Sequence, residues 1–139
     1  DAAPAHAGGR PLDIRILLVD DHAPFRQCLS ALLSRQPGLR VVVEAGDGLA
    51  ALEHLAALAE AERPQVMVVD VEMPGLDGIE TTRRAHALYP GLAIVALTLH
   101  DDPQLATAMT AAGALTCLRK GDRMADIVRA IRAAAGSAP

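Results

Sequence analysis

The stretch VVDVEMPGLDG, Val68 to Gly78, is an apolar run that ends on a carboxylate and then turns through Met, Pro and Gly. Burying an unpaired charge costs free energy, so Asp70 needs an open edge or compensating groups. Asp70 either caps the turn that follows it or belongs to a site that does chemistry. We expect Gly75 and Gly78 to serve the turn, with Gly78 also allowing close backbone approach before a helix.

The rest of the chain repeats this order of apolar run, turn and amphipathic helix. We predict strands at residues 14–19, 39–45, 65–70, 92–98 and 114–118. We predict helices at residues 24–35, 48–62, 77–88, 103–113 and from 124 to beyond 131. Strands that read as continuous apolar runs indicate a parallel sheet covered on both faces, so the predicted class is α/β.

Length and composition predict one domain. The 139 residues are 51% hydrophobic, which suits a single core. We assign residues 13–135 to the domain, 1–12 to a flexible tail and 136–139 to the start of a linker or an artificial end.

The charge balance and the apolar runs exclude some classes of function. The net charge of −4 and the presence of only two aromatic residues, Phe25 and Tyr89, argue against direct nucleic-acid binding. No apolar run reaches the roughly 18 residues that a membrane helix needs. Cys28 and Cys117 lie in apolar patterns, where free thiols act as small hydrophobes, and this favours a reducing, cytoplasmic setting.

Polar residues follow four of the five predicted strands. Asp20 and Asp21 follow the first strand, Asp70 ends the third, Thr98 ends the fourth and Lys120 follows the fifth. In a parallel sheet these ends meet at the ligand-binding edge. Carboxylates about 4 Å apart repel by roughly 4 kcal/mol at an effective dielectric near 20, so the cluster must protonate or hold a cation. Mg²⁺ takes one or two carboxylates, which leaves another free to attack phosphorus.

Four motifs occur in the order typical of one family: LLVDDH (17–22), VVDVEMPGLDGIE (68–80), ALTLH (96–100) and LRKG (118–121). With them the chain resembles the response-regulator receiver domain of bacterial two-component systems, in its LuxR/NarL-type branch. The resemblance implies a flavodoxin-like, doubly wound, five-stranded parallel sheet in the order 2-1-3-4-5 with five helices.

The resemblance also assigns roles in an Mg²⁺ and phosphoryl site. It makes Asp70 the phospho-acceptor and a metal ligand, Asp21 a direct ligand and Asp20 a ligand through water. The backbone carbonyl of Glu72 would complete the protein's share of the metal sphere. Two further residues would sense the phosphoryl group, Thr98 by a hydrogen bond and Lys120 by its charge.

The function implied is that of a regulatory domain which catalyses its own phosphorylation and dephosphorylation. The phosphoryl donor would be a sensor histidine kinase, and phosphorylation would change a partner or homodimer surface. Members of this branch usually contact DNA through a C-terminal domain, which we expect to be absent from this chain.

Cys117 and Leu99 depart from the family pattern, and Glu72 and His100 flank its site residues. Cys117 stands where the family often has an aromatic residue. Leu99 stands where the family usually has a small residue, and it is expected to narrow the path along which Thr98 moves toward the phosphoryl group. Glu72 and His100, each two residues past a site residue, are expected to line the approach of water and tune hydrolysis.

Two alternative functions stay open at this point. A haloacid-dehalogenase-like phosphohydrolase uses similar groups, but there the nucleophile lies on the first strand, and Asp70-Val71-Glu72 lacks that family's second aspartate. A degenerate receiver would act only as an interaction module.

Overall fold

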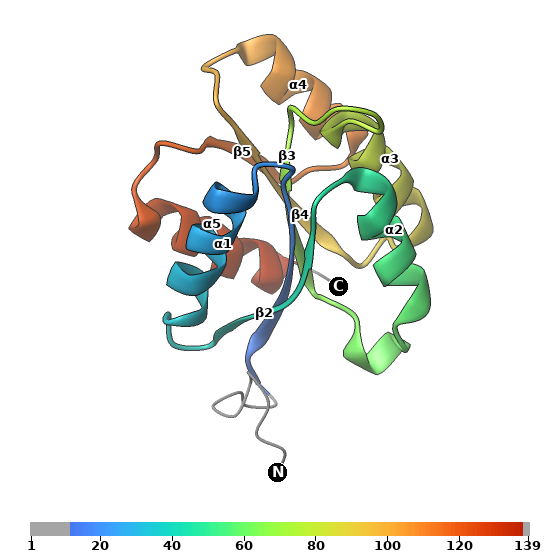
Figure 1. Cartoon of the computed structure of the whole chain (residues 1–139), viewed down its shortest axis with the longest axis vertical. Helices are drawn as coiled ribbons and strands as arrows, with labels where there is room; N and C mark the ends of the chain where they lie inside the picture. The colour runs from blue at the N-terminus through green and yellow to red at the C-terminus, as the bar shows by residue number, and fades with distance from the viewer. Residues whose placement is uncertain (1–11, 138–139) are drawn as a thin grey trace.

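The computed structural model describes residues 12–137 and contains one five-stranded parallel sheet (Figure 1). The strands run in the order β2-β1-β3-β4-β5, so the predicted order and class are confirmed. Their bounds are β1 Ile14–Val19, β2 Leu39–Ala45, β3 Val66–Asp70, β4 Ala93–Thr98 and β5 Thr116–Arg119. The helices are α1 Ala23–Ser34, α2 Gly48–Ala57, α3 Gly78–Leu88, α4 Pro103–Ala112 and α5 Met124–Ser137.

Helices cover both faces of the sheet, as Figure 1 shows with α1 and α5 on one side and α2, α3 and α4 on the other. Side chains alternate along each strand, so β1 sends Ile16 and Leu18 to the α1 and α5 side, and Leu17 and Val19 to the other. β3 and β4 are buried along their whole length. The two apolar layers hold the strand ends in place, and with them the residues that follow the strands.

Three predicted boundaries differ from the structure by more than one residue. The predicted helix over 48–62 ends at Ala57, and a short 3₁₀ turn, η1 Glu60–Glu62, follows. Residues 59–62 are all exposed, so a longer helix would bury no apolar face there. The fifth strand lies two residues later at its start than predicted, and α5 continues past 135 to Ser137.

The prediction for one cysteine was wrong. Cys28 is exposed, because α1 buries Leu29 and Leu33 and turns Cys28 outward, whereas Cys117 is half-buried on β5. Both thiols are free.

The turn between β3 and α3 depends on two glycines. Gly75 has a φ of +72°, a backbone conformation that residues with a side chain rarely adopt. A Cβ on Gly78 would lie 2.1 Å from the carbonyl oxygen of Asp70. The expected turn geometry and close approach are therefore confirmed.

The predicted tail and linker fall largely outside the described residues, which exclude 1–11 and 138–139. Within residues 12–137, no helix has the length and apolarity required to cross a membrane.

Candidate functional site

Three carboxylates meet at the carboxyl edge of the sheet. Asp20 follows β1 and is 1% exposed, Asp70 ends β3 and is 3% exposed, and Asp21 lies beside them in solvent. One oxygen from each carboxylate lies within 4.8 Å of the others. Hard oxygen ligands at this spacing, two of them buried, suit a divalent cation such as Mg²⁺.

The backbone orients the two buried carboxylates in the same way. Asp20 Oδ1 accepts a hydrogen bond of 2.8 Å from the amide of His22, and Asp70 Oδ1 accepts one of 3.1 Å from the amide of Glu72. In both cases the acceptor lies two residues before the donor, which is the geometry of an Asx turn. The Oδ2 atom of each carboxylate is left to face other groups.

Lys120 connects the two carboxylates. Its Nζ lies 2.8 Å from Asp20 Oδ2 and 3.3 Å from Asp70 Oδ2, and its side chain is buried. Burial by itself would lower the pKa of Lys120, but the hydrogen bonds and charges of Asp20 and Asp70 outweigh it and raise that pKa. The ammonium is therefore a firmly charged neighbour of the predicted phospho-acceptor.

The pKa of Asp70 is raised from its usual 3.8 to about 7. Burial is the main cause, the charge of Asp20 adds to it, and Lys120 and the amide of Glu72 oppose it. A divalent cation at the three carboxylates would counter both causes of the rise. The site thus favours a cation that keeps Asp70 ionised.

Thr98 reaches the same edge, but its hydroxyl is directed at another residue. Thr98 Oγ1 donates to Glu72 Oε2 at 2.6 Å, and the amide of Leu99 donates to Glu72 Oε1 at 3.3 Å. The amide of His100 donates in turn to Thr98 Oγ1 at 3.1 Å. The engagement of Thr98 by the Glu72 side chain was not predicted from the sequence.

The residues that depart from the family pattern lie around this pair. Leu99 is 66% exposed, so its side chain extends into solvent and does not narrow the path of Thr98 as expected. His100 is also exposed. Burial and, secondarily, the charge of Glu72 raise the pKa of the Cys117 thiol, which indicates that Cys117 lies near Glu72.

Sequence reasoning missed two residues of α1 that support the site. Lys120 Nζ lies 4.6 Å from the centre of the Phe25 ring, a cation–π arrangement. Arg26 Nη1 donates to the backbone carbonyl of Asp20 at 2.6 Å, and its Nε pairs with Glu44 at 3.2 Å. The position of Phe25 and Arg26 in the first turn after the acidic pair was the available signal.

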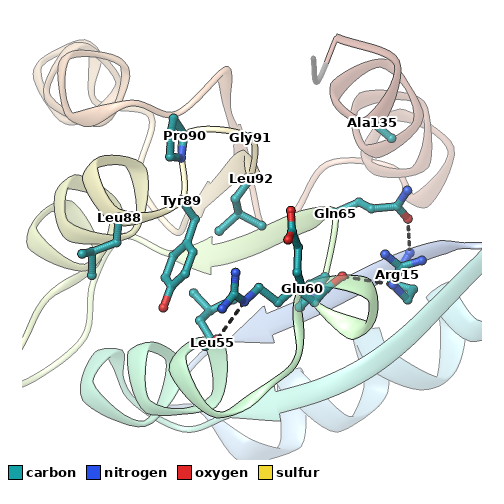
Figure 2. A pocket seen from close by; sticks show the side chains of 12 residues that line it. Arg15, Leu55, Glu60, Gln65, Leu88, Tyr89, Pro90, Gly91, Leu92 and Ala135 are labelled. Carbon is teal, nitrogen blue, oxygen red and sulfur yellow. Dashed lines mark hydrogen bonds between the residues drawn. The ribbon is translucent and has the colours of Figure 1, made fainter.

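A hollow of about 470 Å³ lies at the opposite edge of the sheet, lined by Arg15 of β1, by residues that precede β3 and β4, and by one residue each of α2 and α5 (Figure 2). Arg63 lies 4.9 Å from the Tyr89 ring centre and donates to the carbonyl of Leu55. Arg15 donates through its side chain to the carbonyl of Arg63. These arginine contacts anchor the segment between α2 and β3, away from the carboxylate cluster.

The model of one protein family, the response regulator receiver domain, matches residues 16–132. The chain belongs to this family. Its match extends from β1 into α5 and so includes all the strand ends described above. Membership in this family favours the receiver over the haloacid-dehalogenase-like alternative.

The similar proteins place this receiver domain in the LuxR/NarL-type branch. It is 36% identical over 119 residues to the response regulator GacA of Pseudomonas viridiflava, covering 86% of this chain and 54% of GacA. A LuxR-family response regulator from Aurantimonas superposes with a TM-score of 0.82 at 32% identity, over 91% of this chain and 87% of that one.

The receiver domain of NarL from Mycobacterium tuberculosis superposes with a TM-score of 0.80 at 31% identity, over 90% of this chain and 98% of that one. The chain spans about half the length of the curated relatives it matches.

Proposed function

We propose that this receiver domain is a phosphorylation-dependent switch in which Asp70 accepts the phosphoryl group. The observation that supports this best is the placement of Asp70 between two further carboxylates and a buried ammonium, at the end of a central strand. Lys120 lies 3.3 Å from Asp70 Oδ2, where it can offset charge added to that oxygen.

The proposed transfer forms one bond and breaks one. An oxygen of the Asp70 carboxylate attacks phosphorus while the bond from phosphorus to the donor's imidazole nitrogen breaks, and the electron pair stays on that nitrogen. The product is a mixed anhydride on Asp70. A bound Mg²⁺ would neutralise phosphoryl charge, and Asp20, Asp21, Asp70 and the backbone carbonyl of Glu72 would hold it.

The partners belong to the same proposal. We infer that the donor is a phosphohistidine on a sensor histidine kinase, and that phosphorylation alters a partner or homodimer surface. Because the relatives are response regulators about twice as long, we further infer that the switch controls a C-terminal DNA-binding domain. The similarity to the LuxR-family and NarL proteins supports this output.

The decisive experiment is intact mass after incubation with acetyl phosphate, with and without Mg²⁺. We expect a single phosphoryl increment in the wild type that requires Mg²⁺ and is lost in Asp70→Asn. Asp101→Asn is the matched control, because the Asp101 side chain is 82% exposed and pairs only with Arg119 among the described residues, at 3.7 Å.

Each alternative gives a different result in that experiment. No increment under any condition would identify a degenerate receiver and contradict the proposal. Continuous release of phosphate with repeated turnover would contradict it in favour of a phosphohydrolase.

A further inference from the structure

The carboxylate of Glu72 occupies two hydrogen-bond donors at the end of β4. Its Oε2 accepts from the Thr98 hydroxyl at 2.6 Å, and its Oε1 accepts from the Leu99 amide at 3.3 Å. Glu72 lies two residues past Asp70, and its own amide donates to Asp70 Oδ1. An anionic group therefore already sits on these donors, beside the predicted site of phosphorylation.

We propose that Glu72 is a positioning residue that competes with the phosphoryl group for Thr98 and Leu99. This inference rests on the proposed function, since it needs an acyl phosphate at Asp70. In the unphosphorylated chain the Glu72 carboxylate holds the end of β4 in one arrangement. Phosphorylation displaces that carboxylate, and the phosphoryl oxygens take over its donors.

Donor chemistry makes the two arrangements mutually exclusive. The Thr98 hydroxyl has one proton to donate, and the Leu99 amide has one. A carboxylate and a phosphoryl group both accept through anionic oxygens, so each would form strong, charge-assisted hydrogen bonds with these donors. Their negative charges also repel each other at this separation, which favours withdrawal of Glu72 once phosphate is present.

The surrounding contacts connect this exchange to the rest of the edge. The amide of His100 donates to Thr98 Oγ1, and the amide of Lys120 donates to the carbonyl of Thr98 at 2.8 Å. If the Thr98 hydroxyl changes its hydrogen-bond partner, the change can therefore move the loop after β4 and also Lys120, which contacts Asp70. By accepting the hydrogen bond from Thr98, Glu72 stabilises the unphosphorylated arrangement of the end of β4. It therefore sets the free-energy difference between that arrangement and the phosphorylated one.

The first test uses nuclear magnetic resonance on the unphosphorylated protein, with Glu72→Gln and the Asp101→Asn control. Beryllofluoride with Mg²⁺ serves as the phosphoryl mimic for wild type. We expect the Thr98 methyl and Leu99 amide signals of free Glu72→Gln to lie on the line between the free and beryllofluoride-bound wild-type positions. Asp101→Asn should keep the free wild-type positions, although it removes the same charge.

The second test separates competition for donors from simple charge repulsion. We expect Glu72→Gln to lower the beryllofluoride concentration at half-saturation by about three- to tenfold, the difference in worth between a charge-assisted hydrogen bond and the neutral one that the Gln amide oxygen can still accept. In a Thr98→Val background the same substitution should have a markedly smaller effect. A purely electrostatic role for Glu72 would give the same ratio in both backgrounds.

The outcomes distinguish the two proposals. Unmoved Thr98 and Leu99 signals in Glu72→Gln, or an equal ratio in both backgrounds, would overturn the role of Glu72 while leaving Asp70 as acceptor. Wild type that takes up neither a phosphoryl group from acetyl phosphate nor beryllofluoride would overturn the proposed function, and this inference with it.

Discussion

At the scale of single residues, the site is built from charges that are individually unfavourable and collectively balanced. Asp20 and Asp70 are both buried at the same edge, and each points one oxygen to a backbone amide and the other to Lys120. One ammonium cannot neutralise two carboxylates and the nearby Asp21. A divalent cation at the site and a proton on Asp70 therefore compete to neutralise the remaining negative charge.

Asp70→Asn should stabilise the metal-free domain at alkaline pH. The pKa of about 7 in the folded chain lies above the usual 3.8, so the folded chain binds this proton more tightly than the unfolded chain does. The resulting stability is complete below pH 3.8 and is lost as the pH rises through 7. We expect Asp70→Asn to raise the free energy of unfolding by about 1–3 kcal/mol at alkaline pH.

Urea denaturation without Mg²⁺, at about pH 8 and about pH 5.5 for wild type and variant, measures this difference. The advantage of Asp70→Asn should shrink at the lower pH, because wild-type Asp70 is then mostly protonated. A pH-independent difference would contradict the raised pKa. Asp101→Asn again serves as the exposed control.

Cys117 should react slowly with iodoacetamide compared with Cys28. Cys28 is exposed, whereas Cys117 is half-buried and has a raised pKa, first from burial and second from the charge of Glu72. Because the thiolate is the nucleophile, the Cys117 rate should keep rising above pH 9, and Glu72→Gln should increase that rate at neutral pH. Peptide mass mapping of a timed alkylation gives both rates, and equal rates for the two cysteines would contradict the burial of Cys117.

At the scale of elements, the site depends on the close contact of α3 with the end of β3. Gly78 begins α3 against the carbonyl of Asp70, and its own amide donates to the carbonyl of Val71 at 3.2 Å. Asp77 caps the helix by accepting from the amide of Glu80. The turn that carries Asp70 and Glu72 is therefore held at both of its ends.

Gly78→Ala should disturb both the fold and phosphorylation. The added Cβ would lie 2.1 Å from the Asp70 carbonyl oxygen, so backbone has to move. We expect a loss of about 2–4 kcal/mol in the free energy of unfolding and a lower phosphorylation rate in the variant that still folds. Gly91→Ala is the matched control, because a Cβ there meets nothing within 4 Å.

Denaturant unfolding of both variants, followed by intact mass after acetyl phosphate treatment, tests this prediction. Gly91→Ala should stay within about 0.5 kcal/mol of wild type. Equal stability of the two variants would mean that the close approach of α3 to Asp70 is not needed.

At the scale of the whole molecule, the doubly wound order brings distant segments to one edge. β1 and β3 are neighbours at the centre of the sheet, so Asp20 and Asp70 meet although fifty residues separate them. The two helical layers bury β3 and β4 along their whole length, and at the carboxyl edge of the sheet Asp21 is exposed to solvent. A ligand bound there contacts several strands at once and should stabilise the entire domain.

Mg²⁺ should raise the stability of wild type and have little effect on Asp21→Asn. At a Mg²⁺ concentration ten times the dissociation constant, one site adds about 1.4 kcal/mol to the free energy of unfolding. Asp21 is exposed, so Asp21→Asn should remove the metal response without harming the metal-free fold. Thermal unfolding with EDTA and with increasing Mg²⁺ measures this, and an equal Mg²⁺ response in both proteins would contradict a role for Asp21.

The α/β class and the residues that end the strands follow from the sequence alone. Burial on both faces requires continuous apolar runs, and polar residues stand where those runs stop. With the family resemblance the sequence also predicted the strand order. Gly75 and Gly78 were predicted correctly, since only glycine tolerates such backbone conformations and contacts.

The way in which the side chains at the carboxyl edge share hydrogen-bond and ion-pair partners depends on the folded arrangement of the chain. The pairing of Glu72 with Thr98 joins residues 26 apart, and the contact of Phe25 with Lys120 joins two elements that are distant in sequence. The early end of α2 and the outward turn of Cys28 depend on which helix faces find something to bury. Such choices are settled by packing and by competition for hydrogen-bond donors, and neither leaves a local pattern in the sequence.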